Sequence, residues 1–173
     1  PGPGEAFHSS LDGGDGNGTG LESFREILAD ASIDKYVHDL KNVTHLLLNR
    51  GFVLDGVAAD SVLASYLLDP SKPDHDLATL SWEYLGENLH ALPPPEEEER
   101  RMEPRTASIA LCQRAEIIFR LKARMEKELV ERKLLDLLDE MELPLTAVLV
   151  EMERTGIAVN RQRLKEFSHY IEA

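Results

Sequence analysis

Cysteine is nearly absent from the sequence: Cys112 is the only one among 173 residues. A single thiol cannot form an internal disulfide, and it cannot build a cysteine-based zinc site. Long apolar runs are also lacking, since stretches such as 62–68 are far shorter than the roughly 20 residues that span a bilayer. No basic segment followed by an apolar run is present, so we expect no secretory signal and no membrane partner.

Positive charge is scarce as well. Lys and Arg number 19 against 32 Asp and Glu, which gives a formal net charge of −13 at pH 7. A surface this acidic repels a phosphate backbone, so the chain alone is expected to bind nucleic acid weakly. Apolar residues make up 42% of the chain, and the length suits one domain with part of a second. Because the sequence begins at Pro1 and not at Met, we expect a piece of a longer protein.

Two segments are too biased in composition to form a core. Residues 1–20 hold seven of the eleven glycines and are predicted to be flexible, although residues 5–8 resemble the end of a strand. Three prolines at 93–95 are followed by four glutamates at 96–99. This composition predicts a stiff, solvated linker at about 91–105.

Between these segments, extended and helical patterns alternate. Short strands are predicted at 33–37 and 52–54, and helices at 40–50, 61–68 and 77–85. Asp60 is placed to cap the second of these helices, and Gly86 to end the third. We expect Trp82 and Tyr84 to pack in the core rather than to stack on bases. The alternation of strand and helix favours a parallel or mixed sheet in an α/β domain.

After the linker the pattern is helical. A long charged helix is predicted from 109 to about 140, and its apolar face carries Ile117, Leu121, Met125 and Leu129. Pro144 is expected to break or restart this run, and Gly156 to stop the helix that follows. Asn160 is placed to cap a last helix at 161–171.

Three segments together resemble a known family. They are residues 35–51, which include YVHDLKNV, residues 56–86, which begin GVAADSVLASYLLDP, and residues 141–160, which end MERTGIAVN. In the same order, they are similar to the 3′–5′ exonuclease domain and the start of the polymerase domain of bacterial DNA polymerase I, a family A polymerase. The resemblance covers residues 23–173, most of the chain.

The resemblance implies a ribonuclease H-like (DnaQ-like) α/β fold that lacks its first strands and is followed by helices leading into a polymerase thumb. It divides the chain into a glycine-rich segment at 1–20, an exonuclease-like domain at 21–132 and the start of the polymerase domain at 133–173. The longer protein would be a DNA-directed DNA polymerase, a nucleotidyltransferase of replication and repair that uses Mg²⁺. Its implied partners are DNA and the palm, fingers and thumb of the same chain. Its implied location is the bacterial cytoplasm and nucleoid, or an organelle in a eukaryote.

The resemblance also locates the positions of the exonuclease metals. Two-metal hydrolysis needs several carboxylates around two divalent cations. The family has aspartates where this chain has Val43 and Arg114, and a catalytic tyrosine where it has Ala110. Valine cannot ligate a metal, and a guanidinium repels cations. Asp39 and Glu116 remain as weak candidates, since Asp39 is simply explained as a helix cap and Glu116 as a solvated charge.

No Asp-x-Glu pair in a strand context precedes Asp39, so a further part of the family's metal site is missing from the sequence. We therefore predict no catalytic residue, no metal and no cofactor in this chain, and an exonuclease-like domain that serves as a scaffold. Two other functions stay open. One is an active metal-dependent 3′–5′ exonuclease, for proofreading or similar to ribonuclease D, and the other is a non-catalytic interaction module.

Overall fold

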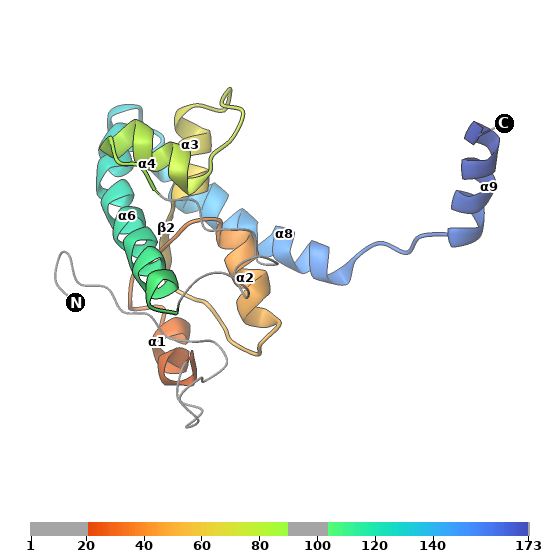
Figure 1. Ribbon diagram of the computed structural model, residues 1–173, viewed down its shortest axis with the longest axis horizontal. Helices are drawn as coiled ribbons and strands as arrows, with labels where there is room; N and C mark the ends of the chain where they lie inside the picture. Colours follow the sequence, from red (N-terminus) through yellow and green to blue (C-terminus); the bar gives the residue numbers. More distant parts are fainter. Residues whose placement is uncertain (1–20, 90–103, 173) are drawn as a thin grey trace.

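The computed structural model describes residues 21–89 and 104–172 (Figure 1). The predicted strand at 5–8, the glycine-rich segment and most of the predicted linker lie outside these residues. In chain order the elements are the 3₁₀-helix η1 (Leu21–Phe24), α1 (Arg25–Ala29), β1 (Lys35–Val37), α2 (Leu40–Leu48), β2 (Val57–Asp60), α3 (Ser61–Leu68), α4 (Leu77–Leu85), α6 (Pro104–Glu131), α7 (Leu135–Leu137), the π-helix η2 (Leu138–Glu142), α8 (Leu143–Thr155) and α9 (Arg161–Glu172).

The sheet of the described residues consists of β1 and β2, which are parallel. Lys35 pairs with Val57 and Val37 pairs with Asp60, with a register irregularity after Lys35. Helix α2 makes the connection between the two strands, as a parallel pair requires. The expectation of a parallel arrangement is confirmed.

The predicted strand at 52–54 is wrong, because the second strand begins at Val57. Phe52 is buried and stacks under the guanidinium of Arg25, whose Cζ lies 4.1 Å from the ring centroid. The left-handed backbone of Gly56, with φ +67°, then turns the chain into the ladder. A short apolar run marks burial, and it does not by itself distinguish a strand from a buried loop.

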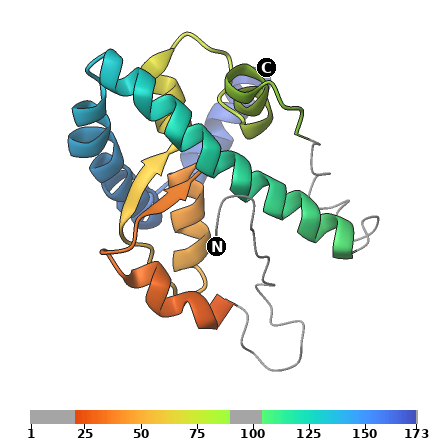
Figure 2. The same ribbon diagram turned by 90° about the vertical axis from the view of Figure 1, so that its left-hand side faces the viewer.

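The hydrophobic core lies between α3, α4, α6 and η2. Helix α6 runs across the two strands in Figure 2 and buries its whole predicted apolar face, namely Ile117, Leu121, Met125 and Leu129. Tyr84 packs against this core, whereas Trp82 is 58% exposed. The prediction of a core position for Trp82 is wrong, because α4 presents that side chain to solvent while it buries Leu77 and Leu80.

Helix α6 ends at Glu131 and not near residue 140. Lys133 adopts a left-handed backbone conformation with φ +59°, and the N–H of Leu134 reaches back to the carbonyl of Leu129 over 2.8 Å. No glycine or proline occurs at this break, and the apolar periodicity continues through it. The sequence therefore gave no sign that the helix ends here. The helical path then restarts through α7 and η2 into α8, with Pro144 in the first turn of α8.

The C-terminal part of the chain makes little contact with the core. Gly156 ends α8, and the side chain of Asn160 accepts bonds from the N–H groups of Gln162 and Arg163, as predicted. Residues 151–171 are all exposed, and α9 stands apart from the other helices in Figure 1. None of the helices described is long and apolar enough to cross a membrane.

Candidate functional site

Asp39 follows β1 and begins α2. Its backbone is left-handed, with φ 64°, and its carboxylate accepts from the N–H of Asn42 at 3.3 Å and from the Asn42 side-chain amide. This arrangement is a helix N-cap. The carboxylate of Asp39 is therefore already engaged in holding the first turn of α2.

Val43 lies one turn further along α2 and is half-buried. Its N–H donates to the carbonyl of Asp39 over 3.0 Å. Its side chain is a hydrocarbon and offers no metal ligand. The chain thus presents an isopropyl group where the family motif has a carboxylate.

Helix α6 carries the other positions that the resemblance assigns to the family motif. Ala110 and Arg114 are half-buried and one turn apart. Glu116 is exposed and forms a 3.8 Å ion pair with Arg120, so it belongs to the solvated face of the helix. Helix α6 packs on β1, and the positive charge of Arg114 contributes to the lowered pKa of His38 in the loop after β1, whereas Glu116 is paired with Arg120.

His38 lies in this loop, and the sequence analysis gave it no role. Its Nδ1 is 2.8 Å from the Ser61 hydroxyl. Burial lowers the pKa of His38, Asp39 and Asp76 raise it, and the positive charge of Arg114 lowers it. The net pKa is below the ordinary value, so the imidazole is largely neutral at pH 7. The site therefore combines a neutral imidazole with a guanidinium.

Asp60 joins the two strand ends to the two helices that follow them. Its carboxylate accepts from the N–H groups of Asp39 at 3.1 Å, Leu40 at 2.9 Å and Val62 at 2.8 Å. Burial raises the pKa of Asp60, and these three backbone hydrogen bonds oppose that rise. The sequence predicted the cap on α3, but the bonds to Asp39 and Leu40 depend on the parallel pairing of β1 with β2.

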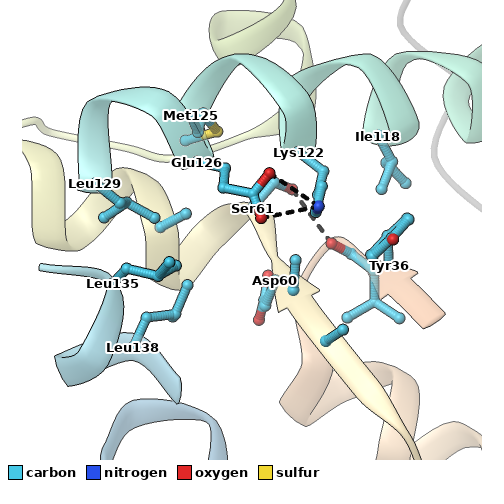
Figure 3. Close-up of a pocket in the computed structure, with 14 residues that line it drawn as sticks. Tyr36, Asp60, Ser61, Ile118, Lys122, Met125, Glu126, Leu129, Leu135 and Leu138 are labelled. Atoms are coloured by element: carbon cyan, nitrogen blue, oxygen red, sulfur yellow. Dashed lines mark hydrogen bonds and ion pairs between the residues drawn. The ribbon is translucent and has the colours of Figure 1, made fainter. Parts of the chain in front are cut away.

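A small cavity lies further along α6, where that helix crosses the strands (Figure 3). Lys122 at its rim forms a 2.9 Å ion pair with Glu126 and lies 5.1 Å from the ring centroid of Tyr36. The cavity has a volume of about 20 Å³, and the apolar residues that line it include Leu129 and Leu138. One water molecule would fill this space, so the cavity is no pocket for a nucleotide.

The residues present do not fit a two-metal centre. Among residues 21–89 and 104–172, no group of three or more His, Cys, Asp or Glu side chains could hold a metal ion. A hard divalent cation requires several oxygen ligands, most of them charged. At the positions where the resemblance predicts such ligands, this chain has Val43 and Arg114, and the neighbouring Asp39 caps α2.

The sequence was compared with known protein families. Residues 18–91 match the family described as DNA polymerase I, ribonuclease H-like domain. This part of the chain is therefore similar to the ribonuclease H-like domain of DNA polymerase I. This finding confirms the resemblance and the ribonuclease H-like fold, and the two-stranded sheet followed by helices is consistent with a truncated domain of that kind.

Individual relatives agree with the family. DNA polymerase I of Mycobacterium tuberculosis (strain H37Rv) is 35% identical over 143 residues, which cover 80% of this chain and 16% of that protein. The Bacillus subtilis DNA polymerase I is 30% identical over 158 residues, or 88% of this chain and 18% of that protein. The chain therefore spans less than a fifth of the length of these polymerases.

Among solved structures, the polymerase domain of Pol1 from M. smegmatis, in complex with a DNA primer-template and dNTP, superposes with a TM-score of 0.74 at 31% identity. The match covers 87% of this chain and 24% of that one. The likeness thus extends beyond residues 18–91 into the C-terminal helices.

Proposed function

We propose that this chain is part of a family A DNA polymerase, and that residues 21–132 act there as a nuclease-inactive scaffold. Template-directed DNA synthesis, with its Mg²⁺ requirement, would be carried out by palm, fingers and thumb regions outside residues 1–173. The relatives are polymerases, and the M. smegmatis neighbour was solved with primer-template and dNTP. Residues 133–173 would be the start of the polymerase domain.

The observation that carries the scaffold function is the position of Arg114. Arg114 is half-buried on α6, which packs on β1, and its positive charge helps to lower the pKa of His38, in the loop that also carries Asp39. A fixed positive charge opposes the binding of divalent cations at the same place. Val43 stands where a second ligand would be needed, so the motif positions on α2 and on α6 are both altered.

DNA would be bound through the polymerase regions rather than by this segment. The net charge of −13 disfavours contact with phosphates, and the described ion pairs already engage many of the cations, for example Arg120 with Glu87 and Lys122 with Glu126. A cytoplasmic location, at the nucleoid, follows from the proposed substrate.

A nuclease assay tests the scaffold function. The 173-residue chain is incubated with a 5′-labelled single-stranded oligonucleotide and Mg²⁺ or Mn²⁺, with EDTA as control. We expect no shortening by the natural chain, and little by the double variant Val43→Asp with Arg114→Asp, because residues 1–38 contain no Asp-x-Glu pair. EDTA-sensitive shortening by the natural chain would overturn the proposal and favour the active exonuclease.

A further inference from the structure

Helix α8 touches α2 through a cluster of charged side chains. Glu153 uses both carboxylate oxygens: Oε1 lies 2.7 Å from Lys41 Nζ, and Oε2 lies 2.8 Å from His45 Nε2. Lys41 and His45 are four residues apart on α2, so they project from the same face of that helix. One carboxylate on α8 thus bridges two residues of α2 that are more than 100 positions away in sequence.

A second polar contact lies beside the first. Arg154 Nη1 donates to the side-chain oxygen of Asn49 over 3.2 Å. Earlier on α8, Thr146 and Val150 are the buried residues, and α8 contacts both α2 and β2. Figure 1 shows α8 crossing beside α2 before the chain leaves toward α9.

These polar contacts mark the end of the packed region. After Arg154 the described residues continue through Gly156 to α9, and all of residues 155–171 are exposed. The last turn of α8 buries no side chain, so apolar packing alone does not fix it to the body. Polar contacts join this turn to α2 and to the residue that follows it: the ion pairs of Glu153 with Lys41 and His45, and the hydrogen bond from Arg154 to Asn49.

We propose that Glu153 locks the end of α8 onto α2, so that the exonuclease-like domain and the helix that begins the polymerase domain move as one body up to Gly156. This proposal deepens the proposed scaffold function, and the role of the lock within a polymerase rests on that function. The lock fixes the last turn of α8 against α2. This turn then sets the direction in which the chain continues toward α9.

The solvent exposure of the paired side chains determines how strongly these ion pairs hold α8 to α2. The side chains of Glu153 and Lys41 are 48% and 40% exposed, and that of His45 is 23% exposed. Ion pairs of this kind change a local equilibrium by about 1.5- to 5-fold. The lock should therefore control fraying of the last turns of α8 without controlling global folding.

Amide hydrogen exchange, measured by mass spectrometry on the 173-residue chain, tests this proposal. In Glu153→Gln we expect exchange at residues 151–156 to be about two- to fivefold faster than in the natural chain. Lys41→Gln combined with His45→Gln should produce the same increase, and adding Glu153→Gln to this pair should add little. About 1 M NaCl should accelerate exchange in the natural chain and not in Glu153→Gln.

Glu151→Gln provides the matched control. Glu151 is exposed on the same helix, and the described residues show no ion pair for it. Equal exchange in Glu151→Gln and Glu153→Gln, or no difference between Glu153→Gln and the natural chain, would overturn the lock. If one variant fails to fold, exchange at residues 151–156 of the natural chain that does not change with salt would by itself overturn the lock.

The outcome separates the two proposals. If exchange is unchanged by Glu153→Gln while the chain has no nuclease activity, the lock fails and the scaffold function stands without it, on the packing of the earlier part of α8, where Thr146 and Val150 are buried. If the chain degrades DNA, the scaffold function fails whatever the exchange data show.

Discussion

Gly56 shows how one residue can position a strand. Its φ is +67°, and a Cβ atom built on it would lie 2.7 Å from the carbonyl oxygen of Ile33 and 2.9 Å from that of Ala31. Both atoms belong to the backbone, which cannot move aside without disturbing β1. The carbonyl of Gly56 also accepts from the N–H of Lys35 at 2.9 Å, at the first rung of the parallel pair.

We predict that Gly56→Ala lowers the free energy of unfolding by about 3 kcal/mol, because left-handed strain adds to the steric overlap. Gly51→Ala is the control, since Gly51 has φ +75° and open space around the position of a Cβ. Its expected cost is about 1 kcal/mol, from backbone strain alone. Urea unfolding measures both, and equal losses would contradict the steric argument.

Asp60 is the residue on which the geometry of the candidate site depends most. Asp60→Ala would leave the N–H groups of Asp39, Leu40 and Val62 without their acceptor. We expect a loss of about 3 kcal/mol in the free energy of unfolding. Asp76→Ala, which removes an exposed cap with a single bond to Thr79, should cost about 1 kcal/mol. A smaller loss for Asp60→Ala than for Asp76→Ala would refute this role.

At the scale of elements, helix ends with a chemical signal were predictable and those without one were not. Asp60, Gly86, Gly156 and Asn160 mark helix ends in the structure as they do in the sequence. The break after α6 has no such signal, because a lysine occupies the left-handed position. The strand at 57–60 was missed because three of its four residues are Val-Ala-Ala, which is too short a pattern to distinguish a strand from the start of a helix.

Lys133 gives a prediction at this scale. Glycine at a left-handed helix end avoids the steric cost that a lysine incurs, so Lys133→Gly should raise the free energy of unfolding by about 1 kcal/mol. Lys127→Gly, at an exposed position within α6, should lower it by about 1 kcal/mol. Thermal unfolding monitored by circular dichroism shows whether the two variants change the stability in opposite directions or in the same direction. A decrease in both variants would mean that Lys133 is not strained.

The contact between α2 and α8 should depend on pH. Hydrogen bonds and charge from Lys41 and His45 lower the pKa of Glu153. A lowered pKa in the folded state means that the contact is fully formed above the ordinary pKa of a glutamate and is lost as pH falls through the lowered value. Carboxylate titration by NMR should show the pKa of Glu153 rising toward its ordinary value in Lys41→Gln. No rise, or an equal rise in the control Lys127→Gln, would contradict the pairing.

For the whole molecule, the resemblance to DNA polymerase I could be predicted from the sequence, whereas the alteration of the metal positions at Val43 and Arg114 stays a prediction. The electrostatic influence of Arg114 on His38 could not be predicted, because it depends on how α6 packs on β1. The joint cap by Asp60 and the bridge from Glu153 to α2 also escaped prediction. Each of these contacts joins residues far apart in the chain, and neither periodicity nor local spacing carries that information.

We propose that this segment belongs to a polymerase that synthesises DNA and does not remove it from the 3′ end. One gel on the longer natural protein that contains this segment, with a 5′-labelled primer on a template and Mg²⁺, tests this function. We expect the primer to keep its length without dNTPs and to be extended when they are added. Shortening of the primer without dNTPs, or no extension with them, would contradict the proposed function.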